Sequence, residues 1–147
     1  GGDFSSFQGW SVTGRGSAEL VQHAGSSMVK LTTGSPVYLS QLLDTPTGEF
    51  ILAYDVDLSE TWGQDLYVYL NNTLIDTIYN TTNGLVRREL TITQPGLMGL
   101  SEAELKFRLD YSSAGKVAYL DNVELIPEPA TVLLLALAAP MLLRRRQ

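Results

Sequence analysis

Cysteine is absent from this 147-residue chain. No disulfide framework and no thiolate metal site can therefore form, which excludes the usual kinds of structural zinc site. His23 is the only histidine, and no nucleophile-elbow motif accompanies it. The sequence therefore disfavours a catalytic triad and any metal site built from several imidazoles.

Charged residues are also scarce, at 18% of the chain against roughly 25% in average soluble proteins. The formal net charge is −6, and three of the ten basic residues are Arg144, Arg145 and Arg146 near the C-terminus. The rest of the chain is therefore more acidic still. Because an acidic surface repels phosphate backbones, we expect no nucleic-acid partner. Neutral sugars and divalent cations stay open as ligands.

Long stretches with apolar residues at helical spacing are missing before residue 126, where apolar residues instead alternate with period two. In 65–71, for example, Leu66, Val68 and Leu70 share one face while two tyrosines point the other way. The alternation predicts an all-β sandwich of two sheets in a single domain, residues 1–126. We expect about nine strands, at 18–22, 28–33, 37–43, 49–57, 65–71, 74–79, 86–93, 104–111 and 116–125.

The composition changes abruptly at residue 127, where a tail over 127–147 begins with Pro127, Glu128 and Pro129. The two prolines predict an extended, accessible segment that cannot join the sheet. An uncharged run over 130–143 follows, which would form a short hydrophobic helix of about 21 Å, less than the roughly 30 Å of bilayer hydrocarbon. The terminal arginines should stay cytoplasmic, which leaves the body outside.

This tail closely resembles the PEP-CTERM sorting signal of Gram-negative bacteria, which a membrane enzyme, exosortase, recognises. The resemblance implies export, transient inner-membrane anchoring, processing near Pro127 to Pro129, and delivery to the cell surface or exopolysaccharide matrix. A stable single-pass anchor or an amphipathic element is the alternative for the tail. Since the sequence begins at Gly1 without an apolar stretch, we also expect that a leader preceded it.

The two ends of the body, GGDFSSFQGW and VAYLDNVEL, resemble the ends of galactose-binding-like jelly rolls found in carbohydrate-binding modules. Some such modules hold a structural calcium between the first segment and an aspartate of the last strand. The resemblance therefore implies a jelly-roll fold and a candidate calcium site at Asp3 and Asp121. Ser5 stands where the family has a glutamate ligand, and both aspartates could instead bond backbone amides.

Sugar binding requires exposed aromatic rings that stack on sugar rings, with polar groups nearby for the hydroxyls. Trp62, Tyr67 and Tyr69 are the candidate glycan-binding residues, although the tyrosines could equally cover a sheet face beneath a loop. Trp10 and Tyr119 lie where the chain ends should pack together, so we expect them in the core.

The sequence thus predicts a non-catalytic surface or matrix protein, associated with exopolysaccharide or biofilm, that binds polysaccharide. A purely structural scaffold is the alternative. A small carbohydrate-active hydrolase ranks third, because Asp55 and Asp57 share one strand face about 6 to 7 Å apart.

Overall fold

Strands make up almost all of the regular structure. The computed structural model describes residues 9–58, 65–79, 82–110 and 117–128, and in these ranges its one helical element is a single 3₁₀ turn. The all-β prediction is therefore confirmed, whereas the helix expected over 130–143 lies outside the described residues. The elements are β1 (Trp10–His23), β2 (Ser26–Leu43), β3 (Phe50–Asp57), β4 (Asp65–Leu70), β5 (Thr73–Tyr79), β6 (Leu85–Ile92), η1 (Pro95–Leu97), β7 (Ala103–Asp110) and β8 (Val117–Pro127).

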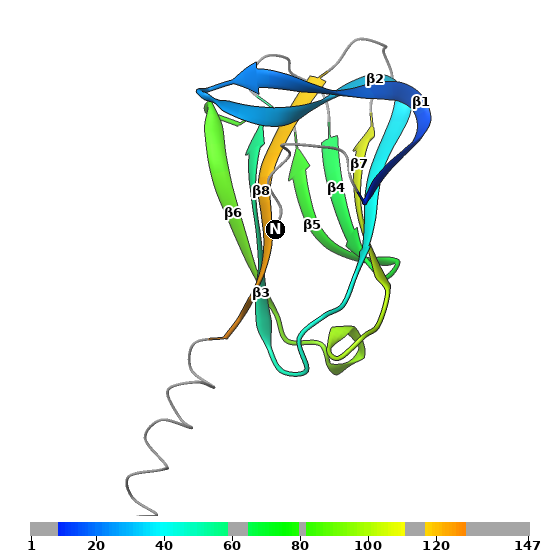
Figure 1. Cartoon of the computed structure of the whole chain (residues 1–147), viewed down its shortest axis with the longest axis vertical. Helices are drawn as coiled ribbons and strands as arrows, with labels where there is room; N and C mark the ends of the chain where they lie inside the picture. The colour runs from blue at the N-terminus through cyan, green and yellow to red at the C-terminus, as the bar shows by residue number, and fades with distance from the viewer. Residues whose placement is uncertain (1–8, 59–64, 80–81, 111–116, 129–147) are drawn as a thin grey trace, which may run out of the picture.

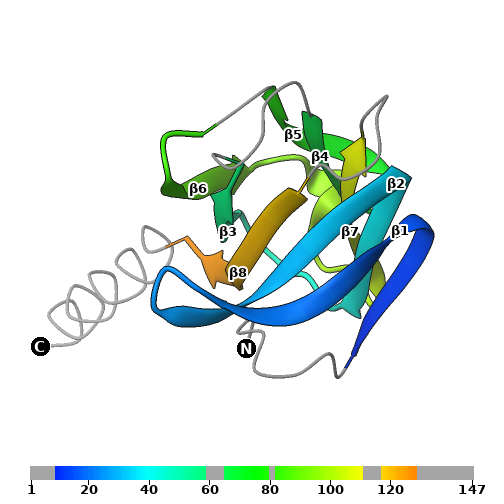
Figure 2. The same ribbon diagram turned by 90° about the horizontal axis from the view of Figure 1, so that it is seen from above.

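The strands form two antiparallel layers that share β1 and β2 (Figures 1 and 2). Sheet I has the order β5, β4, β7, the second half of β2 and the first half of β1. Sheet II has the order β6, β3, β8, the first half of β2 and the second half of β1. In Figure 1 the β1–β2 ribbon crosses the top of the molecule and so closes that end of the sandwich.

Each of the nine expected ranges overlaps a strand, but the described residues contain eight continuous strands. The ranges expected at 28–33 and 37–43 are one continuous strand, β2, whose first half pairs with β8 and whose second half pairs with β7. Gly34, Ser35 and Pro36 resemble a turn in sequence, but here they carry the backbone from one sheet to the other. Opposite them Gly14 has φ +88°, and a Cβ there would lie 2.5 Å from the carbonyl oxygen of Pro36.

β4 and β5 form a hairpin with a tight turn. Asn71 and Asn72 have φ values of +48° and +67°, the left-handed pair that a type I′ hairpin turn requires. Asparagine tolerates this conformation better than most residues, which explains why the sequence places Asn-Asn here.

A single main core fills the space between the sheets. Leu66, Val68 and Leu70 are fully buried in it, as the alternation predicted. Phe107 lies at its centre, 5.2 Å from the ring of Tyr54 and 6.3 Å from that of Trp10. Trp10 is therefore a core residue, as expected. The other buried side chains of this cluster include Leu31, Leu39, Phe50, Leu52, Leu105, Leu109 and Leu120.

A smaller cluster lies on the outer side of sheet II, where Met28, Val117 and Tyr119 are buried with Val21 packed against them. The ring of His23, near the tip of the β1–β2 ribbon, stacks on Tyr119 with centroids 3.7 Å apart. Tyr119 is thus buried as predicted, but in this second cluster and not between the sheets.

The expectation that the proline-rich segment cannot join the sheet is wrong at its first residue. Pro127 is the last residue of β8 and pairs with Phe50, and the amide of Glu128 donates to the carbonyl of Glu49 at 3.1 Å. Near its end β8 pairs with β3 alone, because its contact with β2 stops at Leu120. A proline is tolerated on such a free edge since no ladder bond is lost. Pro129 lies outside the described residues.

Candidate functional site

The outer side of sheet I carries four tyrosines, Tyr38, Tyr67, Tyr69 and Tyr79, and is called the tyrosine face below. Strand register arranges its side chains in rows that run across the strands. One row is Thr77, Tyr67, Arg108, Tyr38 and Thr13, and the next is Leu74, Tyr69, Lys106, Ser40 and Ser11. The prediction that Tyr67 and Tyr69 point away from the core is confirmed, because Leu66, Val68 and Leu70 alternate with them in the core.

Two cations of β7 lie between the tyrosine rings. The Lys106 ammonium is 5.5 Å from the ring centre of Tyr69 and 5.7 Å from that of Tyr38. The Arg108 guanidinium is 5.6 Å from the ring centre of Tyr67 and 5.9 Å from that of Tyr38. Such cation–π contacts contribute about 0.5–1 kcal/mol each at exposed sites. The cations therefore favour the observed positions of three of the four rings.

Each cation also has a carboxylate partner on its own strand. Arg108 donates to Asp110 at 2.8 Å, and Lys106 lies 3.5 Å from Glu104. Partial burial acts to lower the pKa of Arg108, but the Asp110 carboxylate and the Tyr69 and Tyr38 hydroxyls raise it above its ordinary value. Arg108 is therefore permanently charged, and its charge is balanced locally.

Tyr67 donates a hydrogen bond from its hydroxyl to Asp65 at 3.2 Å. Partial burial and the Asp65 carboxylate raise the pKa of Tyr67, so this phenol keeps its proton and remains a donor. The face thus offers hydroxyl donors, cationic donors and carboxylate acceptors beside aromatic rings, which is the combination that polyhydroxylated ligands use.

Sequence reasoning found only part of this surface. Trp62, the third candidate, lies outside the described residues. Tyr38 and Tyr79 were missed, although both alternate with buried neighbours in their strands, and that alternation was the signal for Tyr67 and Tyr69 as well. The pattern within one strand does not show which other strand lies beside it. The sheet order places β2 and β5 on the same face as β4.

Asp121, the better of the two calcium candidates, is 3% exposed. Its Oδ2 accepts a hydrogen bond from the Ser26 hydroxyl at 3.0 Å, while its Oδ1 is buried without a hydrogen-bond partner. A buried carboxylate oxygen without a hydrogen-bond partner is a suitable cation ligand, but calcium takes six to eight oxygen ligands. No group of three or more carboxylate or imidazole side chains among the described residues could hold a metal. Asp3 lies outside them, so the calcium site stays a prediction.

Asp55 and Asp57, the candidate carboxylates for hydrolysis, both point to the outer side of sheet II and are both engaged. Asp55 accepts from Arg87 at 3.1 Å and from the Asn122 amide at 2.8 Å. Asp57 is 5% exposed and lies 2.8 Å from the Nε2 atom of His23. In the structure both carboxylates are therefore held by side-chain partners, which does not favour the hydrolase hypothesis.

The comparisons with known proteins agree on the fold. No protein-family model and no curated protein matches the sequence. Solved carbohydrate-binding modules do match in structure. A family 61 module in complex with β-1,4-galactotriose (TmCBM61) is 16% identical, with a TM-score of 0.60 over 83% of this chain and 90% of that one. The C-terminal family 22 module of Clostridium thermocellum Xyn10B is 13% identical, with a TM-score of 0.63 over 85% and 91%.

An adhesin domain has the same architecture. The K3 cleaved adhesin domain of Lys-gingipain from Porphyromonas gingivalis is 12% identical, with a TM-score of 0.58 over 86% of this chain and 94% of that one. At such identities the likeness shows the fold alone. The chain is therefore an all-β domain with the jelly-roll fold of non-catalytic carbohydrate-binding modules, as its terminal segments predicted.

No helix of the described residues is long and apolar enough to cross a membrane. The tail over 130–143 and the terminal arginines lie outside those residues, so the sorting-signal prediction rests on the sequence.

Proposed function

We propose that this chain is an exported, non-catalytic domain of the bacterial surface or extracellular matrix that binds polysaccharide through the tyrosine face. The observation that carries the proposal is the row of Tyr67, Arg108 and Tyr38, with Lys106 and Tyr69 in the next row, on the outer side of a carbohydrate-binding-module jelly roll. Rings that already contact neighbouring cations have less conformational freedom to lose when a ligand binds, which favours affinity.

The ligand class follows from the surface chemistry and from the relatives. A polyhydroxylated chain can use both the ring edges and the balanced charges of this face. One structural relative is bound to β-1,4-galactotriose and another is described as a xylan-binding domain. We therefore take β-1,4-linked galactan and xylan as first ligands to test, with exopolysaccharide as the wider class.

The test is binding of the full 147-residue chain, in mild detergent, to a glycan array and to galactan and xylan in affinity electrophoresis. A Tyr67→Ala/Tyr69→Ala double variant is expected to lose at least tenfold in affinity, because about 1.4 kcal/mol of hydroxyl hydrogen bonding and ring-edge contact is removed. Trp62→Ala belongs in the same series. Repeating the array in calcium and in excess chelator tests the Asp3 and Asp121 site.

Glu89→Ala/Thr91→Ala is the matched control, since both residues are exposed on β6 of the opposite sheet. It should bind as the unaltered chain does. If no glycan binds under any condition, the alternative applies, namely a structural scaffold. The observation that favours this alternative is that the rings of Tyr38, Tyr67 and Tyr69 already have cations against them.

The tail supports the exported location and a partner of the exosortase type. In a Gram-negative host with an exosortase, and with an export leader added, the chain is expected at the cell surface. A Pro127→Ala/Glu128→Ala/Pro129→Ala variant is expected to remain in the inner membrane, because the apolar run over 130–143 is not removed. Fractionation and immunoblotting measure this, with Gln147→Ala as the control. Equal surface delivery of the triple variant would contradict the assignment.

A further inference from the structure

The tyrosine face has exposed apolar side chains at two opposite ends. Between them lie Tyr38, Tyr67, Tyr69, Lys106 and Arg108, called the central lattice below. At the β5 end Tyr79 is 65% exposed and Leu74 is 50% exposed. Tyr79 pairs with Asp65, and Leu74 pairs with Tyr69, so both lie beside the lattice on its outer edge. At the opposite end, in β2, Leu42 is 61% exposed.

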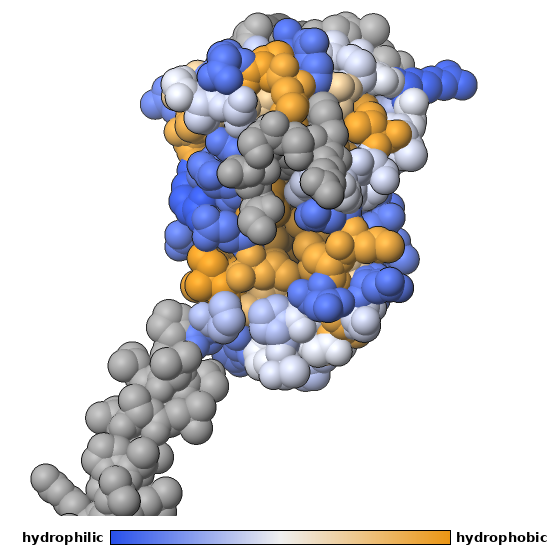
Figure 3. Space-filling model, viewed as in Figure 1, coloured by the Kyte–Doolittle hydropathy of each residue, from blue (hydrophilic) through white to orange (hydrophobic). Residues whose placement is uncertain are grey.

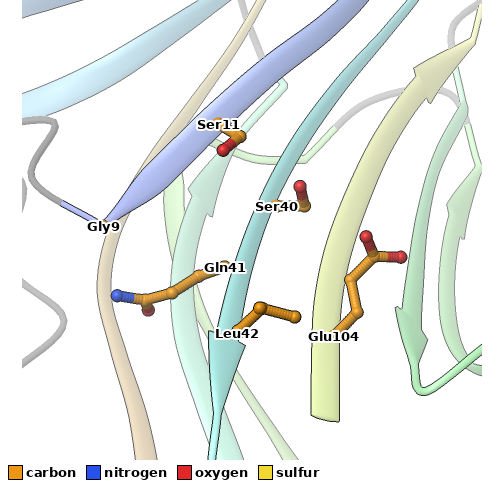
Figure 4. Close-up of a pocket in the computed structure, with 6 residues that line it drawn as sticks. All are labelled: Gly9, Ser11, Ser40, Gln41, Leu42 and Glu104. Carbon is orange, nitrogen blue, oxygen red and sulfur yellow. The ribbon is translucent and has the colours of Figure 1, made fainter. Parts of the chain in front are cut away.

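Leu42 lines a hollow of about 550 Å³, together with Gly9, Ser11, Ser40, Gln41 and Glu104. Figure 4 shows Ser11, Ser40, Leu42 and Glu104 on three neighbouring strands, β1, β2 and β7. Leu42 pairs with Glu104, and Ser40 pairs with Lys106, so the hollow joins the lattice without a break. Two hydroxyls and a carboxylate therefore surround an exposed aliphatic side chain.

Glycine is required at the rim of this hollow. Gly9 has φ +82°, and a Cβ there would lie 3.1 Å from the Nε2 atom of Gln41. Gly9 therefore turns the backbone close to Gln41 at the rim of the hollow.

The two ends provide the apolar surface that is free to contact a ligand, because cations lie against the rings in the middle of the face. The rings of Tyr38, Tyr67 and Tyr69 each have a cation against them, so a ligand meets hydrogen-bonding groups there. The apolar surface for the carbon face of a sugar ring lies at Tyr79 and Leu42. On the side seen in Figure 1, hydrophobic side chains also form a broad band across the lower half of the body and smaller patches nearer the top (Figure 3).

The charges of the face indicate an uncharged ligand. Lys106 and Arg108 are each next to a carboxylate, Glu104 and Asp110, and Asp65 adds a further negative charge. A polyanion would therefore meet more carboxylates than cations. An uncharged glycan avoids this repulsion and still finds donors and acceptors along the whole surface.

We propose that an extended, uncharged glycan lies across the strands of sheet I, with Tyr79 stacking on one unit and the Leu42 hollow holding another. This inference rests on the proposed function and adds its two end subsites. Tyr79 and Leu42 are three strand spacings apart, about 14 Å. Their rows meet β7 at Asp110 and Glu104, about 20 Å apart along the strand. The path is therefore a diagonal of roughly 25 Å, so the surface binds internal stretches of several sugar units better than short fragments.

The test is calorimetry with β-1,4-xylo- and galacto-oligosaccharides of two to six units, using the full chain. Affinity should rise with each added unit until the path is filled. Tyr79→Ala and Leu42→Ala should each weaken hexasaccharide binding by about five- to tenfold and leave disaccharide binding within twofold. Oligogalacturonates of the same lengths should bind more weakly than the uncharged series.

Leu85→Ala is the matched control, because Leu85 is also a surface leucine, 39% exposed, but lies in β6 of sheet II. All three side chains are on the surface, so melting temperatures should agree within a few degrees. If Tyr79→Ala and Leu42→Ala behave like Leu85→Ala at every length, or if the acidic series binds best, the end subsites are overturned while the proposed function stands. If the unaltered chain binds no oligosaccharide or polysaccharide, both fall.

Discussion

Replacing Phe107 with alanine is expected to lower the free energy of unfolding by about 3–5 kcal/mol. The ring is fully buried in β7, at the level of the tyrosine face but on the opposite side of the sheet, and packs edge-on against Tyr54 of sheet II. It also lies beside Trp10, which joins the first strand to the core. Removal therefore leaves a cavity at the point where both sheets and the start of β1 meet.

The measurement is urea unfolding followed by tryptophan fluorescence, to which Trp10 contributes. Phe107→Leu serves as the matched variant, because it keeps most of the volume and should cost less than about 1.5 kcal/mol. A Phe107→Ala effect no larger than the Phe107→Leu effect would show that the two sheets are not held together at this ring.

Asp76→Ala should destabilise the chain by about 2–4 kcal/mol, because Asp76 is the common acceptor of a network that joins the sheets. Asp76 belongs to β5 of sheet I, and its side chain is almost fully buried. The Tyr54 hydroxyl of β3 donates to it at 2.6 Å, and Arg88 of β6 donates through two nitrogens. Alanine leaves the buried phenol without its acceptor and the guanidinium without its counter-charge.

The pKa directions describe the same network. Burial, with the Asp76 hydrogen bond and charge, raises the pKa of Tyr54. The Asp76 hydrogen bonds raise the pKa of Arg88 against the lowering effect of partial burial. Tyr54 is therefore a neutral donor and Arg88 a charged one at all ordinary pH values.

Asp110→Ala is the control for this prediction. Asp110 also accepts from an arginine, Arg108, but that pair is about one-third exposed on each side, so its loss should cost less than about 1 kcal/mol. Urea midpoints measure both variants. Equal losses of stability in the two variants would contradict the prediction, because the buried Asp76 network would then contribute no more than an exposed ion pair.

Much of the candidate site could be predicted strand by strand. Leu66, Val68 and Leu70 alternate with Tyr67 and Tyr69, and period two suffices to assign them to opposite sides. The same rule sends Lys106 and Arg108 outward from β7. It does not predict that β7 lies next to β4 and β2, because these strands are far apart in the chain. Turn residues indicate only where the chain reverses locally.

The sequence did not predict that 28–33 and 37–43 form one continuous strand, for a related reason. Gly34, Ser35 and Pro36 carry the residue types of a turn, but whether such a segment reverses the chain or bends a strand depends on what lies opposite it. Here β1 pairs antiparallel with both halves of β2. Gly14 has no side chain, so the backbone of Pro36 can lie close to it. The pair therefore bends together and passes from one sheet to the other.

By itself the sequence determined the all-β class, the Asn71-Asn72 turn, the core position of Trp10 and the outward direction of Tyr67 and Tyr69, because these depend on local conformation and on period two. The tertiary structure alone decided which strands are neighbours. It thereby brought Tyr38, Lys106 and Arg108 between the predicted tyrosines, set Tyr79 and Leu42 at the two ends of the face, and engaged Asp55 and Asp57 with partners. Contacts between residues far apart in the chain depend on strand order and register, which a local pattern does not specify.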